Sequence, residues 1–235
     1  MTTTAKAPGR KALAAPRGAA VAGVVFSVLM IVCLGLVRYA IPDDLTELDR
    51  WMVEPGRRRA VALALDLVPF AGIAFLWFGG VLRNRLGEHE DQLFATVFLG
   101  SGLLFVASLF GVAAVLHALV DTLAVDRMDS ATFYFGHRMS DAIFYVFAIK
   151  MAGVFIISTC TIGLRTAIIP RWVAIIGYAC ALLQLLVIAN WKWITFVFPL
   201  WILLVSTYIL FAEFRPDPPI RPERRMSLSE NSGKG

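Results

Sequence analysis

The sequence predicts an all-α integral membrane protein, a bundle of six transmembrane helices with both termini in the cytoplasm. Of its 235 residues, 58% are hydrophobic and 17% are charged, whereas a soluble domain carries about 25% charged residues. The apolar residues form blocks of roughly 20, the length that a helix needs to cross a hydrocarbon core about 30 Å thick. Basic residues lie at the block edges, so the net charge of +5 indicates contact with the lipid bilayer and its anionic headgroups, and not with nucleic acid.

The first apolar block follows a basic N-terminal tail. Residues 1–18 are rich in Thr, Ala and Pro and are expected to be disordered. The tail resembles the positive region of a signal peptide, but Arg38 stands where cleavage after Ala40 would require a small residue. The block at 19–41, which ends before Pro42, is therefore expected to remain as a membrane anchor.

An acidic segment, residues 43–53, separates the first span from the second. Its apolar residues Leu45, Leu48 and Met52 fall on one side at helical spacing, which is typical of a short helix at the water–lipid boundary. We therefore expect this segment to lie along the bilayer surface.

Five further spans complete the membrane domain, which runs from residue 19 to residue 214. Short polar turns separate them, and Trp191 and Trp193 frame the last turn, as Trp prefers the membrane interface. The third span is longer than a bilayer requires, which allows it to tilt or to protrude. Residues 215–235, rich in Pro, Arg and Ser, are expected to form a disordered tail. The five spans cover residues 60–82, 93–120, 141–164, 172–190 and 194–214.

The distribution of Lys and Arg predicts the orientation. The side that holds both termini carries 13 of these residues and the opposite side carries 8, which favours cytoplasmic termini and the plasma (inner) membrane of a bacterium. Arg57, Arg58 and Arg59 run against this bias. Five acidic residues precede them in the same loop, and we expect these to offset the arginines.

Three side chains with a charged or amide group are expected to lie deep inside the spans. They are Asp66 in the second span, Lys150 in the fourth and Gln184 in the fifth. At about 1.5 Å per residue, Asp66 lies roughly 10 Å and Lys150 roughly 14 Å below the outer surface. Ionisable side chains are costly in a bilayer unless they are paired or hydrated. We therefore expect an internal polar cluster in which Asp66 pairs with Lys150. A structural ion pair and a transport or proton-relay role are equally open.

Two His-x-x-x-Asp pairs flank the connection between the third and fourth spans. His117 with Asp121, and His137 with Asp141, each lie four residues apart and so share one face of a helix. Lys150 follows Asp141 by nine residues, which is about 180° around a straight helix. The sequence therefore predicts two sub-sites, the internal cluster and this outer rim.

An ordinary interfacial pair is the favoured interpretation of each His-x-x-x-Asp element. Two His and two Asp side chains could also bind Zn or Mn, but no His-Glu-x-x-His motif or Cys partner accompanies them. Haem is disfavoured, because it needs two histidines at matching depth, whereas His137 lies in the outer loop and His89 in an inner turn.

Motifs of soluble enzymes are missing from the sequence. There is no dinucleotide-binding glycine motif, P-loop, nucleophile elbow or zincin motif. Cys33, Cys160 and Cys180 all fall inside apolar blocks without metal-ligand spacing, and we expect them to be small packing residues. We therefore assign no catalytic residue.

Two short elements resemble a family of small uncharacterised bacterial integral-membrane proteins, a domain of unknown function. The first is the stretch from Arg59 to Leu67, Arg-Ala-Val-Ala-Leu-Ala-Leu-Asp-Leu, which opens the second span. The second is the stretch from Ile169 to Gly177, Ile-Pro-Arg-Trp-Val-Ala-Ile-Ile-Gly, which opens the fifth. The resemblance would cover most of residues 19–214. It implies a multi-span membrane protein and adds no catalytic residue.

Together these observations predict a non-enzymatic accessory protein, or one that handles a small solute or protons, with its polar cluster in the outer half of the bundle. The alternative is a membrane-embedded metal-dependent hydrolase or transferase that uses the two His-x-x-x-Asp pairs. Substrate, oligomeric state and partner proteins stay open at this point.

Overall fold

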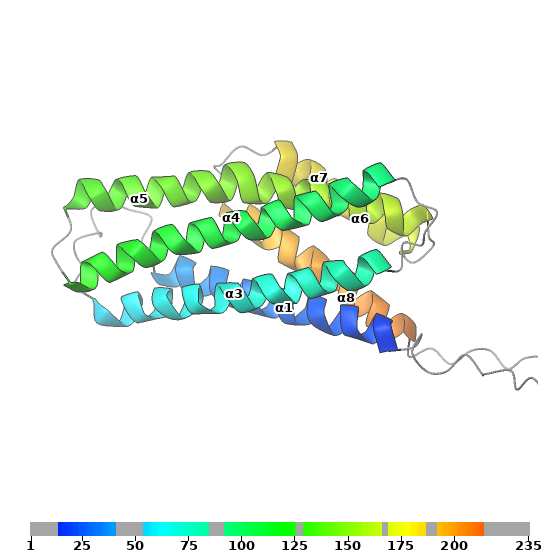
Figure 1. Cartoon of the computed structure of the whole chain (residues 1–235), viewed down its shortest axis with the longest axis horizontal. Coiled ribbons are helices and arrows are strands. Elements are labelled where there is room, and N and C mark those ends of the chain that lie inside the picture. The colour runs from blue at the N-terminus through cyan, green and yellow to red at the C-terminus, as the bar shows by residue number, and fades with distance from the viewer. Residues whose placement is uncertain are drawn as a thin grey trace, which may run out of the picture.

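In the computed structural model, the described residues are 14–40, 54–84, 92–125, 129–165, 169–186 and 192–213, and all regular structure in them is helical. Figure 1 shows an elongated bundle in which long helices lie nearly side by side. The elements are α1 (Ala14–Ala40), α3 (Pro55–Asn84), α4 (Gln92–Val125), α5 (Ser130–Ala142), the π-helix η2 (Ile143–Ala148), α6 (Ile149–Arg165), α7 (Arg171–Leu186), the 3-10 helix η3 (Lys192–Phe196) and α8 (Val197–Glu213).

Five helical segments are long and apolar enough to cross a membrane. They are Gly18–Ala40, Gly56–Arg83, Ala95–Leu123, Ala131–Arg165 and Trp193–Ala212. The expected fifth span, 172–190, is described as far as Leu186, where it forms α7, an apolar helix with 16 described residues. The all-α class is thus confirmed for the described residues, and five of their helical segments have the length and composition of membrane spans.

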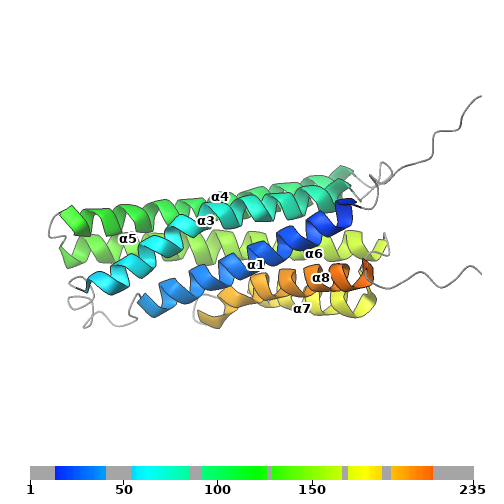
Figure 2. The same cartoon turned by 90° about the horizontal axis from the view of Figure 1, so that it is seen from below.

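Neighbouring helices pack mostly as antiparallel pairs. α1 packs against α3 and α8, α4 lies between α3 and α6, and α6 packs against α7 (Figure 2). α1 begins and α8 ends at the same end of the bundle, which is what an even number of crossings requires. The predicted boundary helix at 43–53 and the C-terminal tail lie outside the described residues. So does the N-terminal tail as far as residue 13, whereas α1 already begins at Ala14.

The centre of the bundle is filled by phenylalanine. Phe75 contacts Phe26, Phe155 and Phe198 with ring centroids 5.0, 4.9 and 5.8 Å apart, and Phe105 lies 4.7 Å from Phe198. Six buried phenylalanines from α1, α3, α4, α6 and α8 form this centre, and we call them the aromatic core. They are Phe26, Phe75, Phe98, Phe105, Phe155 and Phe198.

At one end, α3, α4 and α5 extend beyond α7 and α8 in both views (Figure 1 and Figure 2). A second apolar cluster holds this extension together, with Val61 and Leu65 from α3, Leu119 from α4 and Phe133 from α5. We call residues 55–65, 116–125 and 130–142 the projecting end. Its helices are longer than a bilayer needs, so part of the projecting end is expected to lie in water.

The position of a bilayer follows from the basic residues at the opposite end. About 20 residues measured from Arg83 on α3 and from Arg165 on α6 reach the regions of Leu63 and Tyr145. On α1 the same length from Gly18 reaches Arg38, whose guanidinium lies 4.8 Å from the ring centroid of Trp193 in η3, just before α8. Arg and Trp are typical of the membrane interface. This level is therefore the expected outer surface of the hydrocarbon.

Candidate functional site

Lys150 joins α6 to the end of α7. Its Nζ donates hydrogen bonds to the backbone oxygens of Gln184, at 2.9 Å, and Leu185, at 2.6 Å. The last four carbonyls of a helix have no intrahelical partner and form the negative end of its dipole. An ammonium group therefore fits this position both as a donor and as a charge. Lys150 therefore ties α6 to the last described turn of α7.

Gln184 is the most deeply buried polar side chain at this junction, with an exposed fraction of 1%. Its Oε1 and Nε2 are both buried, and neither has a hydrogen-bond partner among the residues that the structure describes. Burying an amide without partners is unfavourable. The structure thus brings Lys150 and Gln184 together as the sequence predicted, but through the Gln184 backbone and not through its side chain.

Asp66 does not join them. Its side chain is exposed on the outward face of α3, in a row with the exposed Phe70 and Ile73, and the described residues give it no hydrogen bond or ion pair. The reason is rotational: Asp66 and the core-facing Ala64 and Phe75 lie on different sides of α3. The expected pairing of Asp66 with Lys150 is therefore not found.

The depths of these residues also differ from the prediction. Measured from the expected surface near Leu63 and Tyr145, Asp66 lies about 5 Å and Lys150 about 8 Å inside the hydrocarbon. Both values are smaller than the depths expected from sequence, because α3 and the α5–α6 rod continue past the bilayer. Asp66 is thus close enough to the surface for its carboxylate to reach water.

The first rim pair forms a weak contact. His117 Nε2 lies 3.9 Å from Asp121 Oδ2 one turn further along α4, and both side chains are largely exposed. An exposed pair of this kind contributes little to stability. This geometry agrees with the interfacial interpretation of the His-x-x-x-Asp element.

The second rim pair is not joined in the same way. The His137 ring packs near Phe133, with centroids 6.2 Å apart, and its Nδ1 is buried without a partner. Asp141 is half-buried one turn later. Instead, Arg138 Nε donates to Tyr134 Oη at 2.9 Å, and the Arg138 guanidinium lies 5.1 Å from the same ring centroid.

A metal centre is not assembled in the described part of the chain. No group of three or more His, Cys, Asp or Glu residues lies close enough together there to hold an ion, so the four rim residues do not form the donor set that Zn or Mn would need. The α4 and α5 helices do meet here, since a Cβ on Gly136 would lie 2.7 Å from Leu119. They bring apolar side chains together and not the two His-x-x-x-Asp pairs.

The phase argument that separated the rim from Lys150 assumed a straight α-helix. The π-helix at Ile143–Ala148 lies between Asp141 and Lys150. A π-helix bonds residue i to i+5 and so advances by a smaller angle per residue than an α-helix. The two residues are therefore separated by their distance along the rod, one on the projecting end and one inside the bilayer, and not by a half-turn.

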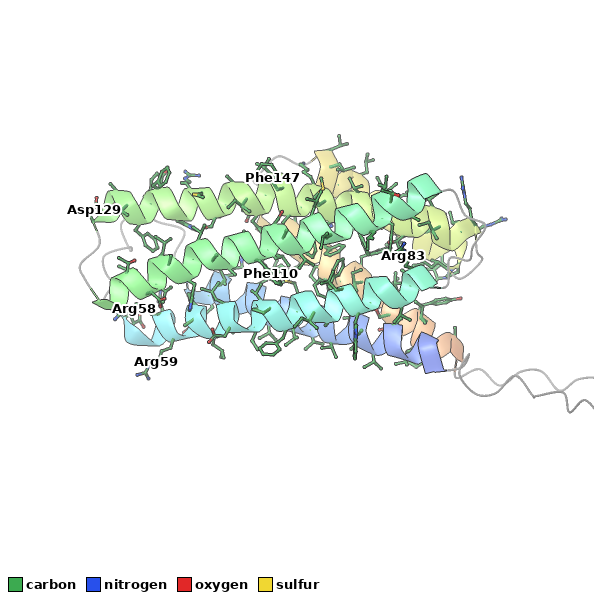
Figure 3. The ribbon with its side chains drawn as sticks, in the orientation of Figure 1. Arg58, Arg59, Arg83, Phe110, Asp129 and Phe147 are labelled. Carbon is green, nitrogen blue, oxygen red and sulfur yellow. The ribbon has the colours of Figure 1, made fainter. Side chains whose placement is uncertain are left out.

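Two arginines of the projecting end have partners that the sequence did not indicate. Arg58 Nη1 donates to the Leu123 carbonyl near the end of α4, at 3.2 Å, and Arg57 Nε lies 3.0 Å from Glu54 Oε2. Arg59 points away from the bundle (Figure 3). The Arg57–Glu54 pair agrees with the expectation that acidic residues of this loop offset its arginines.

The three cysteines are free and act as packing residues. Cys33 Sγ donates to the Ala64 carbonyl of α3 at 3.2 Å, and Cys160 is fully buried beside Gly177. Both therefore fill positions where two helices approach closely, as expected for small residues of a membrane bundle.

Comparison with known proteins does not assign the chain to a family. No family model matches it, and no curated protein or solved structure shows significant similarity to it. The resemblance based on the Ala-Leu-Asp-Leu and Pro-Arg-Trp elements is therefore untested and stays a prediction. Function has to be argued from the geometry alone.

Proposed function

We propose that this chain is a non-enzymatic accessory protein of the plasma membrane, with both termini in the cytoplasm and the projecting end on the outer side as a polar docking surface for another protein. The observation that carries this proposal is the aromatic core. A route for ions or polar solutes is lined by polar groups or water, whereas here the rings of five helices meet where such a route would run.

The position of the polar side chains supports the same proposal. His117, Asp121, Arg138 and Tyr134 are exposed on the projecting end, beyond the expected hydrocarbon boundary. Exposed aromatic and Arg side chains are common at protein interfaces. This end of the bundle therefore offers contacts to a partner, while the middle of the bundle offers apolar surface to lipid.

A photo-crosslinking residue at Arg138 or Asp121 tests the docking role in intact cells. Leu103 is the matched control, because it is exposed on α4 but lies within the expected hydrocarbon. We expect a discrete protein adduct from the first two positions and none from Leu103. Equal adducts from all three positions, or none, would contradict the proposal.

The handling of protons or a small solute is the second candidate, and one observation favours it. Lys150 contacts the last described turn of α7 beside Gln184, whose buried amide has no partner among the described residues, and ionisable and polar side chains inside a membrane bundle mark ion and proton pathways. Liposomes containing the purified protein and a pH-sensitive dye separate the two candidates. Proton flux above that of empty liposomes, lost in Lys150→Met, supports this candidate against the accessory role.

The metal-dependent hydrolase or transferase has no comparable observation in its favour. Its four residues, His117, Asp121, His137 and Asp141, do not form a ligand cluster in the described structure. We therefore do not propose it.

A further inference from the structure

Gln184 is buried on the face of α7 that also carries two small residues, Gly177 and Ala181. Gln184 follows Gly177 by seven residues and Ala181 by three, so the three share one face of α7. A Cβ on Gly177 would contact Cys160 of α6 and Trp201 of α8, and Gly153 of α6 lies against the Ala181 carbonyl. The face that carries Gln184 is therefore packed against two helices and is closed to lipid.

The amide brings two unused hydrogen-bonding functions into this interior. Among the described residues, its oxygen accepts no hydrogen bond and its NH₂ group donates none. Thr159 of α6, by contrast, bonds to its own helix, where its Oγ1 donates to the Phe155 carbonyl at 2.7 Å. The indole Nε1 of Trp201, which faces Gly177 from α8, is also buried without a partner among the described residues. Buried polar groups in proteins are almost always hydrogen-bonded to protein or to ordered water. The Gln184 amide therefore needs a partner that the described residues do not supply.

The chemistry of the position restricts that partner. A metal cation would use the amide oxygen alone and would be repelled by the Lys150 ammonium bound at the same end of α7. An anion would use the NH₂ group alone and would leave the buried amide oxygen without a donor. A small neutral molecule that both donates and accepts uses both functions, and water is the smallest such molecule.

We propose that the Gln184 amide binds an internal water molecule at the junction of α6, α7 and α8. Buried waters typically make about three hydrogen bonds to groups that would otherwise be unsatisfied. A glutamine amide can supply two of these bonds, one to its oxygen as acceptor and one from its NH₂ group as donor. The water then belongs to the structure of the junction. It is a polar site inside the outer half of the bundle, separate from the projecting end.

Replacement of Gln184 by Met distinguishes a bound water from an amide without partners. Met has a similar length and no hydrogen-bonding requirement. If the amide were unpartnered, Gln184→Met would raise the melting temperature, because the cost of burying the amide disappears. If the amide binds water, the variant leaves that water without its partners, and we expect the melting temperature to fall.

Radiolytic footprinting in ¹⁸O water detects the bound water directly, because a bound water generates hydroxyl radical beside the residue that it contacts. The full-length protein in nanodiscs is exposed to X-rays, and labelling of Leu185, the residue next to Gln184, is compared with Leu109, which is buried in the apolar core. We expect labelling of Leu185 to exceed that of Leu109 severalfold and to fall to the Leu109 level in Gln184→Met. Gln184→Asn, which keeps an amide, should retain the label.

Labelling of Leu185 no greater than that of Leu109 in the parent protein would overturn the proposal. A Gln184→Met protein that melts at a higher temperature than the parent would also overturn it. If Gln184→Met fails to fold, the comparison of Leu185 with Leu109 in the parent and in Gln184→Asn still decides the matter.

Discussion

At the residue scale, one cation joins two helices within the apolar part of the bundle. Lys150 of α6 donates hydrogen bonds to two backbone carbonyls in the last described turn of α7, and an unpaired carbonyl is unfavourable in an apolar medium. In exchange, the carbonyls offset the cost of placing an ammonium below the surface. The pair is therefore expected to be worth more together than either group alone.

Replacement of Lys150 by Met leaves two buried carbonyls without donors. We expect the free energy of unfolding to fall by about 1–3 kcal/mol, measured by thermal or denaturant unfolding in a mild detergent. Arg59→Met is the control, because Arg59 is an exposed cation that points away from the bundle (Figure 3). Equal stabilities of the two variants would show that the contact with α7 is unimportant.

Gly177 tests how tightly α7 is packed against its neighbours. A Cβ at this position would meet Cys160 Sγ and would lie 2.7 Å from Trp201 Nε1, so Gly177→Ala has to displace buried side chains. Overpacking of this kind costs about 1–3 kcal/mol, which unfolding in detergent measures. Gly79→Ala is the matched control, since nothing lies within 4 Å of its Cβ. It should be neutral or slightly stabilising.

At the element scale, the sequence predicted the helices well and their ends poorly. The predicted second span, 60–82, lies within α3, and the predicted sixth, 194–214, matches η3 and α8 to within two residues. Apolar blocks of fixed length are set by the bilayer, so they are visible in a sequence. The third span was expected to tilt or to protrude, but the full projecting end was not predicted. Polar residues from Asp121 to Ser140 were taken as the connection between two spans, whereas α4 continues to Val125 and α5 begins at Ser130.

The candidate site was predictable in part for the same reason. Lys150 and Gln184 stand out because polar residues are rare in apolar blocks. Their contact depends on where α7 stops, and the position of Asp66 depends on the rotation of α3 against α1 and α4. The π-helix at Ile143–Ala148 has no sequence signal of its own, and it invalidated an angle calculated for a straight helix.

Arg58 holds the end of α4 in the way that Lys150 holds the end of α7. Its guanidinium donates to the Leu123 carbonyl, so Arg58→Ala should loosen the last turn of α4 at a cost of about 1 kcal/mol. We expect faster amide hydrogen exchange in residues 119–125 and no change in residues 95–110. Arg59→Ala serves as the control. The prediction fails if both variants exchange alike at the end of α4.

At the scale of the whole molecule, the aromatic core is the main source of cohesion. Phe75 contacts four other rings of this set, whereas Phe147 is exposed and points outward (Figure 3). Phe75→Ala should lower the free energy of unfolding by about 3–5 kcal/mol, and Phe147→Ala should leave it nearly unchanged. Thermal unfolding of both variants in detergent measures this difference. Similar losses would mean that burial in the core and exposure to lipid are energetically equivalent here.

The orientation of the whole bundle depends on which basic residues act as free charges. Arg57 is paired with Glu54, and Arg58 is bound to a carbonyl of α4, so two of the three arginines that opposed the predicted orientation are engaged at the projecting end. Arg83, Arg165 and Arg171 mark the opposite end, where α1 begins and α8 ends. Positive charge near span ends is retained in the cytoplasm.

We therefore expect the projecting end to face outward, and cysteine labelling with an impermeant maleimide tests this. Asp129→Cys, beside the start of α5 (Figure 3), should react in intact cells, whereas Thr4→Cys should react after permeabilisation alone. The parent protein is the control, because Cys33 and Cys160 are buried and Cys180 is half-buried. The reverse pattern would place the termini outside. It would also move the projecting end, and with it the proposed docking surface, to the cytoplasmic side.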